Sequence, residues 1–255
     1  MSRIKVGNLN FFGRKGEFEQ RIQLLKDVLE QEKFDILFMQ EVLFVADEHP
    51  AILYLIENGY SIIFGATIKN DSSEYGNLIA YKGTCYNKEI ISLPTKFKDE
   101  PRSAIFSGIE IRGKKLNIVC THLSHGIGLE DYRRKQLKVI VDKVKFINRY
   151  NATPTIIGGD FNSKINEIEV LQSTLLKNVI NCHNDKRYIN MYREKSKYNP
   201  IAIERGLEDK VDYIFFYKEK TERIINISSS FFGLEPNENG NYISDHFGLK
   251  SEFEI

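Results

Sequence analysis

The residues with the clearest chemical potential follow an apolar run in the second half of the chain. The run 155–157 (Thr-Ile-Ile) has the β-branched bulk of a buried strand, and it continues into Gly158 and Gly159. Asp160 and Asn162 come next, and residues i and i+2 of an extended chain point to the same side. The glycines allow backbone or ligand to approach closely. A strand ending in an Asx turn is the plainer interpretation of this stretch alone, so its function depends on the other residues.

Other polar side chains also stand at or beside the ends of predicted strands. The full set is Asn10, Glu41, His122, Asp160, Asn162, Asp212, Asp245 and His246. Each alone has an ordinary interpretation, such as a turn cap, a surface charge or a semi-buried histidine. Strand ends at one edge of a sandwich converge, however, and the loops there build sites. Carboxylates that meet in one place repel unless a divalent cation joins them, and all-oxygen ligands select Mg²⁺, Mn²⁺ or Ca²⁺.

This combination favours hydrolysis of a phosphate ester. Two histidines beside a hard cation suit that reaction better than acyl transfer, because no activated serine or cysteine is evident. Motifs of rival chemistries are missing from the sequence: it has no G-x-x-x-x-G-K-[ST] phosphate loop, no G-x-G-x-x-G after a strand, and no G-x-S-x-G elbow.

Composition sets wider bounds on the protein. The 255 residues carry a net charge of +1, which gives no global basic field, so any nucleic-acid surface must be local. Three distant cysteines in no metal-binding spacing favour reduced thiols. The N-terminus lacks the apolar region of a signal peptide, and no run approaches transmembrane length. We expect a single domain, 1–255, in the cytoplasm, without membrane association or an obligate protein partner.

The order of predicted elements favours two packed sheets over a doubly wound sheet. Strands are expected at 4–10, 35–39, 60–64, 75–81, 85–91, 103–111, 115–121, 155–159, 211–216, 223–230 and 247–253, and helices at 17–32, 48–58, 130–150 and 166–176. Many strands are adjacent hairpins, and about four helices interrupt them, which is typical of sheets covered by outer helices. The polar stretch 181–208 is expected to be loop with short elements. Strand 223–230 is expected to pair with 211–216.

Taken in order, the polar strand ends resemble the endonuclease/exonuclease/phosphatase superfamily. The matching stretches are Leu9-Asn10, Gln40-Glu41-Val42, Thr121-His122-Leu123, Gly158-Gly-Asp-Phe-Asn162, Val211-Asp212-Tyr213 and Ser244-Asp245-His246. The resemblance implies an α/β fold, a four-layer sandwich of two packed mixed β-sheets flanked by helices. Within the superfamily, Phe232-Gly-Leu-Glu235 with 244–249, and 93–96 with Arg102, are most similar to the 5′-tyrosyl-DNA phosphodiesterase branch.

The resemblance also implies roles for these residues. Glu41 and Asp245 would hold Mg²⁺, or Mn²⁺, against the scissile phosphate. Asp160 would orient and help deprotonate the attacking water, while Asn10 and Asn162 would donate hydrogen bonds to phosphoryl oxygens. Many members carry an aspartate two residues after the first-strand asparagine. Phe12 stands there in this chain, which favours one tightly held cation.

The remaining implied roles belong to two histidines. Asp212 would accept a hydrogen bond from His246 and favour its cationic form. His246 would then either take the proton of the water or stabilise charge on the phosphorane-like transition state, and both alternatives stay open. His122 would bind the phosphate from the other side. His125 falls in a glycine-rich loop and is expected at the surface.

The most favoured substrate is DNA, cleaved by nuclease or tyrosyl-DNA phosphodiesterase-like action. Asn77, Arg102 and Lys164 are the candidate substrate-binding residues. A sphingomyelinase or an inositol-phosphate phosphatase of the same superfamily is the alternative enzyme. A binding module that lost its chemistry is the alternative from another class, although the site residues named above are intact.

Overall fold

Two six-stranded mixed sheets form the centre of the computed structural model. The structure describes residues 2–45, 49–149, 153–174, 179–217 and 224–255, and for 170–174 it describes the backbone only. The elements are β1 (Arg3–Asn10), α1 (Phe18–Glu32), β2 (Ile36–Val45), α2 (Pro50–Glu57), β3 (Ser61–Lys69), β4 (Ser73–Tyr81), β5 (Thr84–Leu93), β6 (Arg102–Ile111), β7 (Lys114–His122), α3 (Glu130–Asn148), β8 (Thr155–Asp160), α4 (Ile165–Thr174), β9 (Val179–Asn181), α5 (Lys186–Ser196), α6 (Pro200–Arg205), β10 (Asp212–Tyr217), β11 (Ile225–Phe232) and β12 (Gly248–Glu254). The predicted helix residues Glu48, Tyr150, Leu175 and Leu176, and Arg223 of a predicted strand, lie outside the described residues.

The strand order places the two parallel pairs at the middle of the sheets. One sheet runs β11-β12-β1-β2-β4-β3 and the other runs β5-β6-β7-β8-β10-β9. Parallel pairing joins β1 to β2 and β7 to β8, and the other pairs are antiparallel. Carboxyl ends of parallel strands meet at one edge, so this topology brings the ends of β1 and β2 together, and likewise those of β7 and β8.

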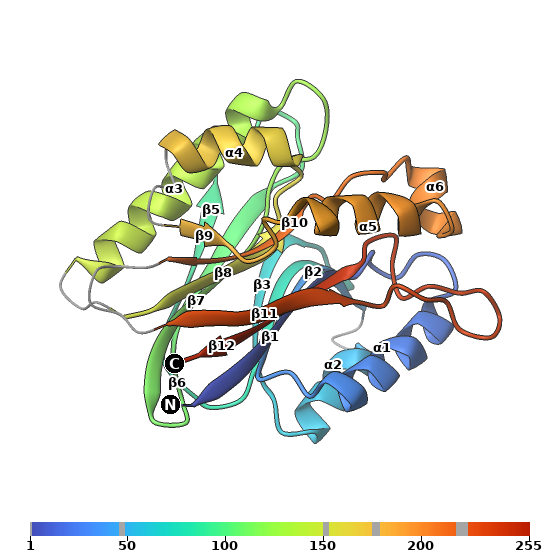
Figure 1. The fold of residues 1–255 in the computed structure, drawn as a ribbon, viewed down its shortest axis with the longest axis horizontal. Coiled ribbons are helices and arrows are strands. Elements are labelled where there is room, and N and C mark those ends of the chain that lie inside the picture. The colour runs from blue at the N-terminus through green and yellow to red at the C-terminus, as the bar shows by residue number, and fades with distance from the viewer. Residues whose placement is uncertain (1, 46–48, 150–152, 175–178, 218–223) are drawn as a thin grey trace.

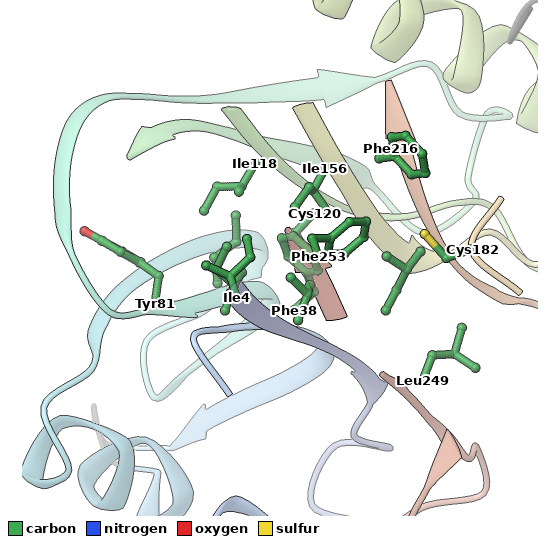
Figure 2. Close-up of a cluster of buried hydrophobic side chains, with 14 of the residues drawn as sticks. Ile4, Phe38, Tyr81, Ile118, Cys120, Ile156, Cys182, Phe216, Leu249 and Phe253 are labelled. Atoms are coloured by element: carbon green, nitrogen blue, oxygen red, sulfur yellow. The ribbon is translucent and has the colours of Figure 1, made fainter. Parts of the chain in front are cut away.

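The predicted four-layer α/β sandwich is confirmed. Helices α1 and α2 cover the outer face of the first sheet, and α3 and α4 cover that of the second (Figure 1). Between the sheets lies the largest buried cluster, where Phe38 and Phe253 of one sheet meet Ile118 and Ile156 of the other (Figure 2). These β-branched and aromatic side chains alternate with outward-facing residues that pack under the helices, which is why both faces of each central strand are apolar.

Glycine is required where the two sheets approach each other beside the predicted site. A Cβ atom on Gly158 would lie 2.1 Å from a ring carbon of Phe38. One on Gly159 would lie 2.2 Å from the carbonyl oxygen of Thr121. The glycine pair therefore lets β8 lie close to β2 of the other sheet and to β7 beside it. This close packing sets how deeply Asp160 is buried.

The stretch 181–208 is more regular than the sequence prediction, because it contains α5 and α6. With these two, the described residues hold six helices rather than about four. Asp185 caps α5 by accepting from the backbone N–H of Arg187, and Asn199 caps α6 in the same way. Gly206 ends α6 with a φ of 66°. These capping signals are local, whereas the prediction relied on apolar periodicity, which is weak in so polar a segment.

The predicted partner of strand 223–230 was wrong. The observed strand, β11, pairs with β12 in the first sheet, while β10 pairs with β8 and β9 in the second. Both sides of β10 are therefore occupied by other strands. Sequence proximity alone favoured a hairpin, but the packing of the two sheets decided the pairing.

No helix among the described residues is long and apolar enough to cross a bilayer. The three cysteines are free thiols.

A buried histidine under the first sheet should make stability depend on acid. His49 is 1% exposed and packs against the rings of Phe11, Phe18 and Phe44. Neither ring nitrogen has a hydrogen-bond partner among the described residues. Burial, followed by the charges of Arg14 and Arg21, lowers the pKa of His49 to about 4.

Because the folded pKa lies below the unfolded one, the stabilisation is complete above about pH 6.5 and is lost as pH falls through about 4. We expect the wild type to lose about 3 kcal/mol of unfolding free energy over that range through this group. His49→Phe should keep the ring packing and remove this share of the loss. Urea unfolding of both proteins from pH 4 to pH 8 measures the unfolding free energy at each pH. If this free energy falls equally in both proteins as the pH is lowered, the prediction is contradicted.

Candidate active site

A bulge in β2 directs Glu41 into the site. The register between β2 and β4 shifts between Met39 and Val42, and Glu41 has a φ of 54°. Such bulges re-aim a side chain, and left-handed backbone at a non-glycine residue is a strain that gathers at functional sites. The sequence prediction placed Glu41 after a strand that ended at Met39. In the structure the strand continues to Val45, so the bulge rather than a strand end presents the carboxylate.

Asn10 joins the carboxylates of the two sheets. Its Nδ2 donates to Oε1 of Glu41 and to Oδ2 of Asp160, each at 3.0 Å. Its Oδ1 accepts from the backbone N–H of Phe12 at 3.0 Å, which fixes the orientation of the amide. The end of β1 therefore links Glu41 of the first sheet with Asp160 of the second.

Asp160 lies at the centre of the group. It is 1% exposed, and its Oδ2 lies 3.4 Å from Nε2 of His122 and 3.8 Å from Nε2 of His246. Burial, followed by the charge of Asp212, raises the pKa of Asp160 to about 7, against the opposing effect of His246. A carboxylate so poised can exchange a proton near neutral pH.

Asn162 reaches the same region by a turn. The strand ends at Asp160, whose Oδ1 accepts from the backbone N–H of Asn162 at 2.8 Å, and Asn162 has a φ of 48°. This is an Asx turn, not the extended chain that the i, i+2 argument assumed. The side-chain amide of Asn162 donates to the carbonyl of Leu123 at 2.9 Å.

His246 and Asp212 form a buried pair. Nδ1 of His246 lies 2.6 Å from Oδ2 of Asp212. Burial opposes the charged form of His246, but Asp212, Asp245 and Asp160 outweigh it and raise the pKa of His246 well above its ordinary value. The imidazole is therefore cationic at neutral pH, with Nδ1–H donating to Asp212.

His122 has the opposite electrostatic setting. Burial, followed by the charges of Arg102, His246 and His125, lowers the pKa of His122 well below its ordinary value. It is neutral at pH 7, so it can serve as a hydrogen-bonding group but not as a permanent cation. The two histidines of the site thus carry different charges, which the sequence did not distinguish.

A chain of buried amides supports Asp212 from behind. Gln40 Nε2 donates to Oδ1 of Asn8 at 3.0 Å, and Asn8 Nδ2 lies 3.4 Å from Oδ1 of Asp212. All three residues are fully buried. Asn8 and Asn10 share a face of β1, and the structure separates their positions: Asn10 bonds to Glu41 and Asp160, and Asn8 bonds to the carboxylate behind His246.

We expect Asn8→Leu to lower kcat/KM on a phosphodiester by about three- to tenfold, because Asp212 loses a hydrogen bond that orients it. The same change in an Asp212→Asn background should have little further effect. Asn117→Leu is the matched control, since Asn117 is also a buried asparagine, on β7 and bonded to Asn148 and Thr155. Additive losses in the double variant would show that Asn8 does not act through Asp212.

The predicted residues converge on one cleft of about 700 Å³. Those that line it are Glu41, Arg102, His122, Asp160, Asn162, Asp245 and His246. Asn10 bridges two of them, and Asp212 lies behind His246. Arg102 is largely buried and pairs with Glu100 at 2.8 Å on the cleft wall. His125, expected at the surface, is exposed and also lines the cleft.

The structure does not bring two of the predicted substrate-binding residues to this cleft. Asn77 is buried and donates to the carbonyl of Ser103 at 3.1 Å, tying β4 to β6. Lys164 is exposed, pairs with Asp209 at 2.8 Å, and lines a neighbouring groove. Contact of either residue with substrate stays a prediction.

Among the cleft residues that sequence reasoning missed, Lys15, Tyr75 and Arg205 carry groups that can bind or polarise a ligand. Tyr75 stands two residues before Asn77 on β4, and burial together with the carboxylates of Glu41 and Glu100 raises its pKa. Lys15 lies in the loop after β1. Arg205 belongs to α6, inside the stretch expected to be loop, so only the caps of that helix could have drawn attention to it.

The donor set fits a divalent cation. Glu41 and Asp245 face the cleft, and neither has a Lys, Arg or His partner within 4.0 Å among the described residues. Asp245 accepts from the hydroxyl of Ser244 at 3.0 Å. Ligand atoms of Asp160, Asp212 and His246 also lie within 4.8 Å of one another. In that second group, however, Asp212 and His246 already bond to each other, so Glu41 and Asp245 are the freer ligands.

Carboxylates, amides and imidazoles gather in one cleft where the two packed sheets meet, a combination of groups that suits the binding of a phosphate ester. Residues 8–246 match the endonuclease/exonuclease/phosphatase family. The chain belongs to this family.

Individual relatives point to one part of the family. The chain is 25% identical over 246 residues to tyrosyl-DNA phosphodiesterase 2 of Gallus gallus, covering 94% of this chain and 63% of that protein. It therefore spans less than two thirds of the length of this relative. The crystal structure of D. rerio TDP2 complexed with single strand DNA product superposes with a TM-score of 0.77 at 22% identity, over 100% of both chains.

The fold is almost equally similar to that of a protein with a different name. The human Nocturnin catalytic domain with bound sulfate anion has a TM-score of 0.76 at 19% identity, covering 99% of this chain and 94% of that one. The two TM-scores are nearly equal. They show that this chain and both structures share an architecture, and they do not identify a substrate.

Proposed function

We propose that this protein hydrolyses phosphodiester bonds with the help of Mg²⁺, and that its substrate is DNA, cleaved in the manner of a nuclease or tyrosyl-DNA phosphodiesterase. The observation that carries the proposal is the position of Asn10, which holds the carboxylates of Glu41 and Asp160 at 3.0 Å each in the cleft that also contains His122 and His246. Acid, amide and imidazole groups around one point suit a tetrahedral phosphoryl group.

Each residue would have a defined task. Asp160 orients the attacking water and accepts its proton, since its raised pKa makes it an effective base near neutrality. His246, held cationic by Asp212, donates from Nε2 to the oxygen that gains charge. A cationic imidazole has no free lone pair, which supports charge stabilisation over the alternative base role. Asn162 and neutral His122 would donate hydrogen bonds to the non-bridging oxygens, and Asn10 would join them by turning an N–H group from Glu41 or Asp160 to the phosphate.

Glu41 and Asp245 are the proposed Mg²⁺ ligands. Bound there, Mg²⁺ would neutralise charge on the phosphoryl and leaving oxygens. Phe12 in place of a further carboxylate supports a single ion. Mn²⁺ should substitute for it, because both cations accept oxygen ligands in octahedral geometry.

The choice of DNA rests on the relatives and on the cleft. A curated relative is named a tyrosyl-DNA phosphodiesterase, and a structural neighbour holds a single strand DNA product.

Free thiols support a reducing compartment, and we propose the cytoplasm. A core shared by both sheets supports residues 1–255 acting as one domain. We also propose that the chain acts without a protein partner.

A substrate panel tests the function. The purified chain, with Mg²⁺ and then with EDTA, is given plasmid, single-stranded DNA, abasic duplex, 5′-tyrosyl DNA, sphingomyelin and inositol phosphates. We expect turnover of DNA that stops in EDTA and returns with Mg²⁺ or Mn²⁺. Activity that survives EDTA would refute the metal assignment. Turnover confined to a lipid or an inositol phosphate would replace DNA with that substrate, and tight DNA binding without any turnover would favour the inactive binding module.

A further inference from the structure

Three cations surround the ring of Phe12 at one side of the catalytic cleft. Lys15 Nζ lies 4.8 Å from the ring centroid, and the guanidinium carbons of Arg21 and Arg205 lie 5.4 Å and 5.6 Å from it. All three distances are within the range of a cation–π contact. Phe12 follows Asn10 by two residues and has a φ of 61°, so its position is fixed by the same turn that presents Asn10.

Arg21 is part of the fold. It is fully buried, and it donates to the backbone carbonyls of Ile243 at 2.8 Å, Lys15 at 2.6 Å and Phe11. Burial lowers the pKa of Arg21 to about 10, against the opposing charges of Asp245 and Glu41. Its donors are committed to the loop that carries Lys15. It therefore holds this loop and is not available to a ligand.

Lys15 and Arg205 differ from Arg21 because both are exposed and both line the cleft with Glu41 and Asp245. Neither has a carboxylate within 4.0 Å among the described residues. Other basic residues near the cleft do: Arg102 pairs with Glu100, and Lys164 pairs with Asp209. The two cations share one ring and come from segments far apart in the sequence, the loop after β1 and the end of α6.

Two like charges held on one ring repel each other unless an anion lies between or beside them. Cation–π contacts hold the two groups at the cleft wall without consuming their N–H donors. Arg205 lines the same cleft as His125, and burial followed by the charge of Arg205 lowers the pKa of that imidazole. Glu204 also lines the cleft, but adjacent residues of a helix do not face each other. This wall therefore carries two cations that have no carboxylate within 4.0 Å among the described residues, beside the groups assigned to phosphate hydrolysis.

We propose that Lys15 and Arg205, held on Phe12, form a second phosphate-binding subsite that takes a backbone phosphate next to the scissile one. This inference rests on the proposed function. It means that the enzyme reads the polyanionic character of its substrate, and that a nucleic-acid strand with several phosphates is preferred over a diester with one. The groups assigned to the reaction hold the scissile phosphate, while Lys15 and Arg205 hold its neighbour.

The test compares an oligonucleotide with bis(4-nitrophenyl) phosphate, which has a single phosphate. We expect the Lys15→Ala/Arg205→Ala double variant to lower kcat/KM on the oligonucleotide by about 10- to 100-fold, mainly through KM. On the small diester the fall should be under about threefold. The salt dependence of oligonucleotide binding should become shallower by about 0.7 log units per log unit of salt for each lost contact. Arg205→Lys should retain most of the wild-type affinity, since the charge remains.

Arg134→Ala and Lys88→Ala are the matched controls, because both cations are exposed, lie away from the cleft and have no ion pair within 4.0 Å among the described residues. Fluorescence anisotropy with the same oligonucleotide measures the subsite even without turnover. The inference is overturned by an equal loss on both substrates, by control variants that lose as much, or by unchanged binding in the double variant. If the wild type hydrolyses neither substrate with Mg²⁺, the proposed function fails, while the binding result still decides the subsite.

Discussion

Replacing Glu41 by glutamine should lower kcat/KM on DNA by at least about 100-fold at saturating Mg²⁺, because the loss of an electrostatic partner of the reacting phosphate costs about 3 kcal/mol or more. The glutamine has nearly the same volume and can keep the bond to Asn10, so the bulge and the fold should survive. What it removes is the negative charge of the only half-exposed carboxylate in contact with Asn10 among the described residues. The activity of the variant should also respond weakly to added Mg²⁺.

The control for this prediction is Glu110→Gln, an exposed carboxylate on β6 outside the cleft. Initial rates over a Mg²⁺ titration, and the thermal midpoint of each protein, separate loss of metal binding from loss of fold. A Glu41→Gln protein with normal rates and a normal Mg²⁺ response would exclude Glu41 as a metal ligand. Asp245 would then be the ligand to test next.

Replacing His246 by glutamine should lower kcat by about 10²- to 10³-fold, with a smaller change in KM. The expected loss is large because Asp212, Asp245 and Asp160 keep the imidazole cationic, and this charge is buried where it acts strongly on the transition state. Glutamine can donate one hydrogen bond but carries no charge. The Asp212→Asn/His246→Gln double variant should be little worse than the single one, since Asp212 acts through His246.

The pH profile distinguishes charge stabilisation from base catalysis at His246. Burial, followed by the charge of Asp212, raises the pKa of Asp160 to about 7, and a divalent cation bound at the site would lower it. The rate should therefore rise with pH as this site loses its proton, and fall at higher pH as His246 loses its own. His246→Gln should lack the alkaline limb and keep the acidic one. Should the variant lose the acidic limb instead, His246 would be the base.

Local rules explain how much of this fold the sequence revealed. The apolar run of 155–157 predicts a buried strand, and the glycines after it predict a close approach, which the short Phe38 and Thr121 distances confirm. Apolar periodicity predicts α1 and α3 to within a few residues. It fails for α5, where polar residues dominate and only the cap at Asp185 marks the start.

Local sequence patterns do not predict which strands pair with each other. The segment that forms β11 has one apolar pattern whichever sheet it joins, and the edge left open by β12 decides its place. The bulge at Glu41 is likewise a product of pairing, because it arises from the register of β2 against β4 and leaves no signature in the letters Gln-Glu.

The sequence by itself determined the chemical kinds of the site: acids, amides and two histidines at strand ends, in an order that resembles one superfamily. Only the tertiary structure decided their states. His122 and His246 are the same residue type, yet burial and then neighbouring cations keep His122 neutral, while three carboxylates make His246 a cation. The contact between Arg205 and Phe12 arises because α6 packs beside the loop after β1, and the sequence alone did not reveal it. The reason is physical: charge state and proximity depend on distances between segments far apart in the chain, which residue types alone do not contain.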